Sequence, residues 1–75
     1  MPIKVYGTKL CGACKNMKSF LTSIGIAFLE IDITENQDAR DEIVNRGFRQ
    51  IPVVKIGEEL IGGYDLDKIK KLLKI

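Results

Sequence analysis

The stretch Ile3-Lys4-Val5-Tyr6-Gly7-Thr8-Lys9-Leu10-Cys11-Gly12-Ala13-Cys14 contains the only two cysteines of the 75-residue chain. The β-branched and aromatic residues at 3–6 predict a short buried strand, and residues 7–10 have the composition of a turn. The apolar residues that follow recur at the spacing of a helix packed by one face, at Met17, Phe20, Leu21 and Ile24. The sequence therefore predicts a strand, a turn and a helix, with both cysteines at the start of the helix.

The two cysteines differ in their position along that helix. A helix that begins at Cys11 or Gly12 places the first thiol on the free N–H groups of its opening turn, where the positive end of the helix dipole favours thiolate over thiol. Cys14 lies one turn further on the same face, within the separation that a disulfide tolerates. We therefore predict a reversible dithiol switch in which Cys11 is the nucleophile.

Other roles for the cysteine pair fit the sequence less well. A structural disulfide that closes so short a loop contributes only about 2 kcal/mol. A zinc site needs two further ligands, and the chain has no histidine and no second cysteine pair. Redox chemistry without a metal site is the favoured interpretation. The alternatives are an iron–sulfur cluster shared between two chains through Cys11 and external thiols, and an idle cysteine pair.

Length and composition indicate one small globular domain that spans residues 1–75. Apolar residues make up 45% and charged residues 29%, which excludes a disordered chain. The net charge is +2, and four lysines in the last eight residues are expected on the solvated face of a C-terminal helix rather than in a nucleic-acid surface. No signal region or bilayer-length apolar run occurs, so we expect a cytosolic monomer that binds neither membrane nor nucleic acid.

The rest of the chain predicts three further strands and two further helices. The strands are expected at 27–33, 53–56 and 60–61. Thr34-Glu35-Asn36-Gln37 has the form of a capping box and opens a helix that Gly47 closes. Asp65 caps the last helix. The element order is therefore βαβαββα, with a right-handed crossover between the first two strands, which are parallel.

Three features follow one another in this order. They are the C-x-x-C of Cys11 and Cys14, an Ile51-Pro52 pair that opens a later strand, and Gly62-Gly63 before the last helix. Together they resemble the glutaredoxin group of the thioredoxin fold, over the whole chain. The resemblance implies an α/β fold in which a four-stranded mixed sheet, strand order 2-1-3-4, carries helices on both faces. It also implies a dithiol–disulfide oxidoreductase.

The resemblance is divided between two branches of that group. Glutaredoxins that use glutathione carry C-P-Y-C, a lysine three residues before the first cysteine, and G-G-x-D-D; this chain differs at Gly12-Ala13, Thr8 and Leu66. Residues 47–54, Gly-Phe-Arg-Gln-Ile-Pro-Val-Val, instead look very like the G-F-R-Q-x-P-V-V of NrdH-type redoxins, and residues 63–67 are similar to their G-F-x-P-D. Those proteins take electrons from thioredoxin reductase and pass them to ribonucleotide reductase. We predict an NrdH-type redoxin, with a glutathione-dependent glutaredoxin as the alternative.

The resemblance also implies a substrate-binding cleft beside the cysteines. The Ile51-Pro52 bond is expected to be cis, which presents the Ile51 backbone to an extended substrate chain. Gly62 and Gly63 either leave room for a backbone or are turn residues only, and Lys9 either adds positive potential near the nucleophile or is solvated. The residues predicted to bind substrate are Lys9, Gly12, Ala13, Gln50, Ile51, Pro52, Gly62, Gly63, Tyr64 and Asp65.

The predicted reaction is a two-step exchange. The Cys11 thiolate attacks a disulfide of a partner protein, and Cys14 then attacks Cys11 and releases the reduced partner. The redox-active group is the Cys11–Cys14 disulfide, and no bound cofactor is expected. The dithiol is restored by an external reductant, either thioredoxin reductase with NADPH or glutathione.

Overall fold

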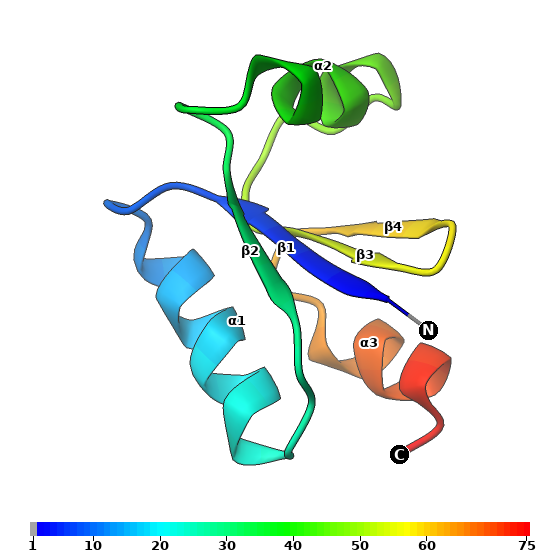
Figure 1. Cartoon of the computed structure of the whole chain (residues 1–75). Helices are drawn as coiled ribbons and strands as arrows, with labels where there is room; N and C mark the ends of the chain where they lie inside the picture. Colours follow the sequence, from blue (N-terminus) through cyan, green and yellow to red (C-terminus); the bar gives the residue numbers. More distant parts are fainter. Residues whose placement is uncertain (1) are drawn as a thin grey trace.

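β1 (Ile3–Gly7) pairs with two neighbours in a four-stranded sheet of order β2-β1-β3-β4. The computed structural model describes residues 2–75. β2 (Leu29–Asp32) runs parallel to β1, whereas β3 (Val53–Ile56) is antiparallel to β1 and forms a hairpin with β4 (Glu59–Gly62). The predicted element order and strand order are confirmed (Figure 1).

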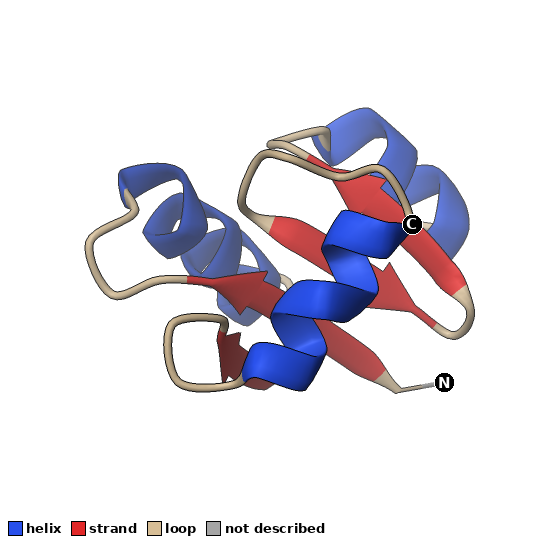
Figure 2. Cartoon of the chain, turned by 90° about the horizontal axis from the view of Figure 1, so that it is seen from above, coloured by secondary structure: helices blue, strands red, loops and turns tan. Residues whose placement is uncertain are grey.

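The helices cover both faces of the sheet. α1 (Gly12–Ser23) and α3 (Leu66–Leu73) lie on one side of the sheet and α2 (Gln37–Asn45) on the other (Figure 1), and a view from above shows the strands running between the helices (Figure 2). Successive strand residues point to opposite faces. Val5 accordingly packs with residues of α1 and α3, while Tyr6 packs with residues of α2. β1 is therefore buried on both faces, which holds the turn after it in a defined place.

The second helix begins later than the capping-box prediction placed it. Asn36 is the N-cap of α2, and its Oδ1 accepts a hydrogen bond from the Ala39 N–H at 3.0 Å. Thr34 instead donates its N–H and its hydroxyl to Asp32 Oδ1, at 2.9 and 2.6 Å. The prediction was wrong because the carboxylate at the end of β2 binds Thr34 in a turn of its own. β2 is also shorter than the predicted 27–33, since pairing with β1 covers only four of its residues.

The other ends of the elements lie near their predicted positions. The Asp65 carboxylate caps α3 by accepting a hydrogen bond from the Lys68 N–H at 3.1 Å, as predicted. α1 ends at Ser23, within one residue of Ile24, the last apolar residue of its predicted pattern, and β4 is one residue longer at each end than predicted. These ends leave the predicted architecture unchanged.

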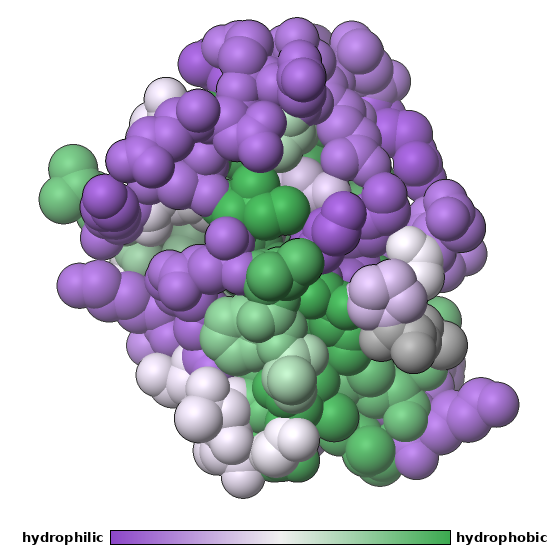
Figure 3. Space-filling model, viewed as in Figure 1, coloured by the Kyte–Doolittle hydropathy of each residue, from purple (hydrophilic) through white to green (hydrophobic). Residues whose placement is uncertain are grey.

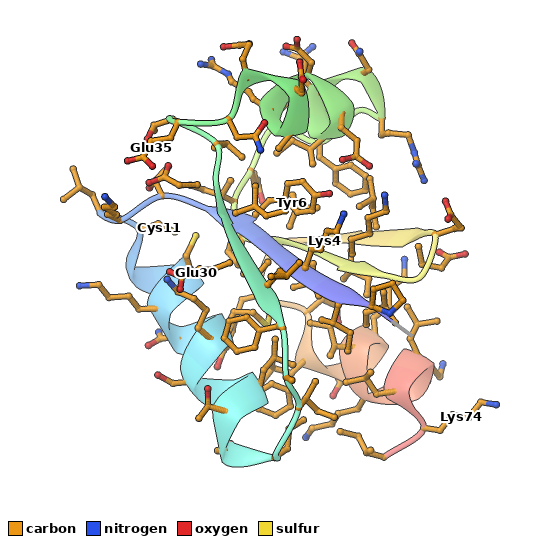
Figure 4. All side chains as sticks on the ribbon, viewed as in Figure 1. Lys4, Tyr6, Cys11, Glu30, Glu35 and Lys74 are labelled. Carbon is orange, nitrogen blue, oxygen red and sulfur yellow. The ribbon has the colours of Figure 1, made fainter. Side chains whose placement is uncertain are left out.

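A polar link joins α2 to the sheet. The Tyr6 hydroxyl donates to Glu42 Oε1 at 2.8 Å, and Lys55 Nζ donates to Glu42 Oε2 at 2.7 Å. Burial and the bond to Glu42 raise the pKa of the Tyr6 hydroxyl, and the bonds from Lys55 and Tyr6 lower the pKa of the Glu42 carboxyl. One carboxylate thus connects α2 with both β1 and β3, and Figure 4 labels Tyr6 beneath α2.

The surface is divided between polar and apolar regions. Figure 3 shows hydrophilic residues over α2 and hydrophobic ones exposed over the lower half of the view. The four lysines near the C-terminus are exposed, as predicted, with Lys70 Nζ 5.8 Å from the centre of the Phe20 ring. Within residues 2–75, no helix is both long and apolar enough to span a bilayer.

Candidate active site

Cys11 is the N-cap of α1 and lies at the end of the loop that leaves β1. Its backbone is extended, with φ −87° and ψ 114°, and its Sγ accepts a hydrogen bond from the Cys14 N–H at 3.1 Å. The loop before it is closed by a bond from the Cys11 N–H to the Thr8 carbonyl, at 3.4 Å. The sulfur is therefore held at the positive end of the helix dipole and is partly exposed. Figure 4 shows Cys11 where β1 passes into α1.

Cys14 lies beneath Cys11 and is 1% exposed. Its side chain fills the space beside Gly7 of β1, where a Cβ would lie 2.5 Å from the Cys14 sulfur. Burial, and next a hydrogen bond with the Cys11 sulfur, raise the pKa of the Cys14 thiol to about 11. The Thr8 N–H and the Lys18 ammonium act in the opposite direction and lower that pKa. Of the two thiols, that of Cys11 is thus partly exposed and that of Cys14 is buried.

The Ile51-Pro52 pair lies at the same end of the sheet as the cysteines. The bond between the two residues is cis. Tyr6 is opposite Val53 in the pairing of β1 with β3, so Pro52 falls opposite Gly7, close to the start of the cysteine loop. Residues 50–52 and the loop 8–11 therefore meet at one end of the sheet.

The two glycines before α3 lie at the same end of the sheet. Val53 is opposite Gly62 in the pairing of β3 with β4, and the Gly63 N–H donates to the Pro52 carbonyl at 2.9 Å. Gly63 has φ +79°, which a side chain disfavours, and a Cβ at Gly62 would lie 2.7 Å from the Phe48 ring. A hydrogen bond thus joins the Pro52 loop to the turn at Gly63. Glycine at position 63 is explained by its backbone conformation, and glycine at position 62 by the close packing of Phe48.

The other predicted substrate-binding residues near this end of the sheet make contacts that do not involve Cys11. Lys9 Nζ donates to Glu35 Oε1 at 3.3 Å, and both side chains are exposed. Asp65 uses one carboxylate oxygen to cap α3, and Tyr64 is 47% exposed. Gly12 and Ala13 are exposed next to the Cys11 thiol, and a Cβ on Gly12 would meet nothing within 4 Å. The described structure therefore brings residues 50–52, 62 and 63 together but pairs Lys9 with Glu35 rather than with Cys11.

A pocket behind Cys14 was missed by the sequence analysis. It encloses about 250 Å³ between α1 and β2. Lys18 of α1 and Glu30 of β2 form an ion pair there, with Glu30 labelled beside α1 in Figure 4. Lys18 lies four residues after Cys14, a spacing that puts two side chains on the same helix face and was the available signal. The residues that line the pocket are Val5, Gly7, Thr8, Lys9, Cys14, Lys18, Glu30, Ile31 and Asp32.

Comparison with known proteins identifies the family. Residues 3–61 match the family model described as Glutaredoxin. The chain belongs to the glutaredoxin family. It is accordingly a thiol–disulfide oxidoreductase.

Individual relatives have nearly the same length as this glutaredoxin-family chain. It is 30% identical to a glutaredoxin-like protein of Clostridium pasteurianum, with 96% of this chain and 97% of the relative aligned. It is 31% identical to the glutaredoxin-like protein NrdH of Lactococcus lactis subsp. cremoris, with 93% and 97% aligned. The solved structure of NrdH-redoxin from Escherichia coli superposes with a TM-score of 0.89 at 30% identity, covering 96% of this chain and 95% of that one. The resemblance to NrdH-type redoxins is confirmed at this level.

Gly7→Ala tests whether the absence of a side chain on β1 is what accommodates Cys14. The added methyl group meets the Cys14 sulfur at 2.5 Å, so we expect a loss of about 1–3 kcal/mol in the free energy of unfolding of the reduced protein. Urea denaturation measures it. Gly12→Ala is the matched control, because its methyl group meets nothing and helix propensity improves by about 0.5–1 kcal/mol.

A double-mutant cycle separates this contact from a general effect on β1. Combined with Cys14→Ala, which removes the sulfur but keeps the Cβ at 3.0 Å from the added methyl group, the Gly7→Ala change is expected to cost less than it does alone. An equal cost in both backgrounds would show that the contact with the Cys14 sulfur is not the reason for the glycine.

Proposed function

We propose that this protein is a dithiol electron carrier of the NrdH type. In this proposal it reduces disulfides of partner proteins through Cys11 and Cys14 and is itself reduced by thioredoxin reductase. The observation that carries the proposal is the asymmetry of the two thiols, with one partly exposed at a helix start and one buried below it. Because the chain resembles NrdH-type redoxins, among them those of Lactococcus lactis and Escherichia coli, ribonucleotide reductase is the proposed partner, in a reducing compartment such as the cytosol.

The proposed reaction has two steps. The Cys11 thiolate attacks one sulfur of the partner's disulfide, a mixed disulfide forms, and the other partner sulfur leaves as a thiolate that takes up a proton. Cys14 then loses its proton and attacks the Cys11 sulfur, which breaks the mixed disulfide and releases the second partner thiolate. The protein is left as the Cys11–Cys14 disulfide, and two electrons from the external reductant restore the dithiol.

The order of the two attacks follows from burial and pKa. Cys14 is 1% exposed, so it offers almost no surface to a partner's disulfide. A thiol whose pKa is raised to about 11 is also protonated almost completely at neutral pH. Cys11, which is partly exposed and accepts the Cys14 N–H, is therefore assigned the first attack.

Recognition of the partner is proposed to involve the backbone of Ile51. Within residues 2–75, neither the N–H nor the carbonyl of Ile51 takes part in a backbone hydrogen bond, although the residue stands next to β3. An extended segment of a partner can pair with these groups as an added strand, which gives affinity without reading side chains. Gly63, whose N–H is bonded to the Pro52 carbonyl, has no side chain that would block the approach of such a segment.

The side chains around Cys11 favour a protein partner over glutathione. Leu10, the residue before the nucleophile, is 98% exposed, and an apolar side chain in that position has no contact to make until a partner covers it. Glutathione has two carboxylates, and Lys9, the lysine nearest in sequence to Cys11, is paired with Glu35. Thioredoxin reductase, which presents a protein surface, is accordingly the proposed reductant.

The choice of reductant is tested by supplying oxidised protein with each electron source. NADPH with thioredoxin reductase is expected to reduce it about tenfold faster or more than NADPH with glutathione and glutathione reductase, since three missing glutathione contacts at about 0.5–1.5 kcal/mol each weaken binding roughly ten- to a thousandfold. NADPH consumption measures both rates. Efficient reduction by glutathione with thioredoxin reductase inactive would move the protein to the glutathione-dependent glutaredoxins.

The role of Leu10 is tested by Leu10→Ser. Loss of a buried leucine contact of about 1.5–3 kcal/mol is expected to lower kcat/KM with thioredoxin reductase by roughly tenfold or more. Exchange with the small disulfide dithiobis(nitrobenzoate), which has no surface to cover Leu10, is expected to stay unchanged. Leu29→Ser is the control, because Leu29 is also exposed, at 61%, but lies on β2. Equal losses in the two variants would remove Leu10 from the interface.

A further inference from the structure

The pocket behind Cys14 contains a positive charge on the same helix face as the thiol. Cys14 and Lys18 are four residues apart on α1, a spacing that brings their Cβ atoms to about 6 Å. Both side chains line the pocket of about 250 Å³ between α1 and β2. The pocket therefore connects the otherwise buried thiol with the Lys18 ammonium.

Glu30 of β2 fixes the position of that ammonium. Its carboxylate accepts a hydrogen bond from Lys18 Nζ, and the Lys18 side chain is 23% exposed while that of Glu30 is 64% exposed. The less exposed member of the pair is thus the cation, which lines the pocket together with Cys14. A lysine on a free helix surface would instead extend into water.

Two further charged residues, Asp32 and Lys9, line the pocket. From β2, Asp32 accepts the Thr34 hydroxyl and N–H, which holds its pKa below the usual value. From the loop after β1, Lys9 is bonded to Glu35. Cys11 contributes a charge only as a thiolate and is neutral once it is joined to a partner. The pocket thus contains four charged side chains, Lys9, Lys18, Glu30 and Asp32, and Lys18 is the cation among them that shares a helix face with Cys14.

We propose that Lys18, positioned by Glu30, stabilises the Cys14 thiolate in the step that releases the reduced partner. This rests on the proposed roles of Cys11 and Cys14. In that step the Cys14 proton leaves through water in the pocket to solvent, the Cys14 sulfur bonds to the Cys11 sulfur, and the partner leaves as a thiolate. The lysine exchanges no proton or electron. It is a positioning residue whose charge makes an anion less costly in a buried place.

The size of the effect follows from the charge and its distance. If the Cβ spacing of about 6 Å is taken as the separation of the charges, a unit charge in an effective dielectric constant between about 20 and 80 changes a thiol pKa by about half to two units. The nucleophilicity of a thiolate rises with its pKa and offsets about half of the loss in thiolate concentration. Removal of the Lys18 charge is therefore expected to slow the second step roughly two- to tenfold at neutral pH.

The second step can be observed alone with dithiobis(nitrobenzoate) and reduced protein in a stopped-flow instrument. Attack by Cys11 releases one equivalent of coloured thionitrobenzoate in a phase that depends on reagent concentration. Attack by Cys14 on the mixed disulfide releases the second equivalent in a phase that does not. The rate of the second phase is measured against pH for Lys18→Met, Lys18→Arg, Glu30→Gln and Lys74→Met.

The expected results differ in direction between variants. Lys18→Met slows the second phase and moves its pH profile upward, Lys18→Arg restores the profile, and the first phase is unchanged in both. Glu30→Gln keeps an acceptor oxygen for Lys18 but removes the negative charge, so its profile moves downward. Lys74→Met, which removes an exposed lysine at the end of α3, leaves both phases unchanged and controls for net charge.

Contrary results are equally specific. If Lys18→Met and Glu30→Gln shifted the second phase in the same direction, the ion pair would have a structural role only. A second phase of normal rate and profile in Lys18→Met would also overturn the proposal. If wild-type protein released a single equivalent, the roles of the cysteines would be wrong instead.

Discussion

The structure depends on the contact between the Cys14 sulfur and the bare backbone of Gly7. Because Gly7 has no side chain, the first turn of α1 lies directly on the last residue of β1 and the sulfur is buried there. The helix begins directly after Cys11, which is its N-cap and is partly exposed, and its opening turn lies at the end of the sheet where Pro52 and Gly63 are joined. The missing side chain of Gly7 thus leaves the space that the buried thiol of the pair occupies.

The two cysteines share one helix turn and still have different environments. Cys11 is at the helix end, with an N–H donor and access to solvent, whereas Cys14 is enclosed and its thiol pKa is raised to about 11. Burial protects the second thiol from reaction with other molecules but also makes its thiolate scarce at neutral pH. The pocket that contains Lys18 and Glu30 borders this buried thiol. In our proposals, Cys11 makes the first attack because it is exposed, and Cys14 makes the second because the nearby Lys18 charge stabilises its thiolate.

Features that depend on neighbouring residues were predictable from the sequence, and those that depend on contacts between elements were less so. The strand-turn-helix order around Cys11 and the Asp65 cap follow from local patterns. The start of α2 was misplaced because Asp32, at the end of β2, competes for Thr34. The pairings of Lys9 with Glu35 and of Lys18 with Glu30 depend on how β2 and the loop after it lie against the segments around the cysteines, which periodicity does not determine.

The division of roles between the cysteines is tested most directly by alkylation of the reduced protein with iodoacetamide over a range of pH, with peptide mass spectrometry to assign each adduct. We predict that Cys11 is modified first throughout the range. Cys14, enclosed and with its pKa raised to about 11, is expected to react appreciably only as the solution approaches that pH. Modification of Cys14 before Cys11, or of both together at the pH of an ordinary thiol, would show that the roles assigned to the two cysteines are wrong.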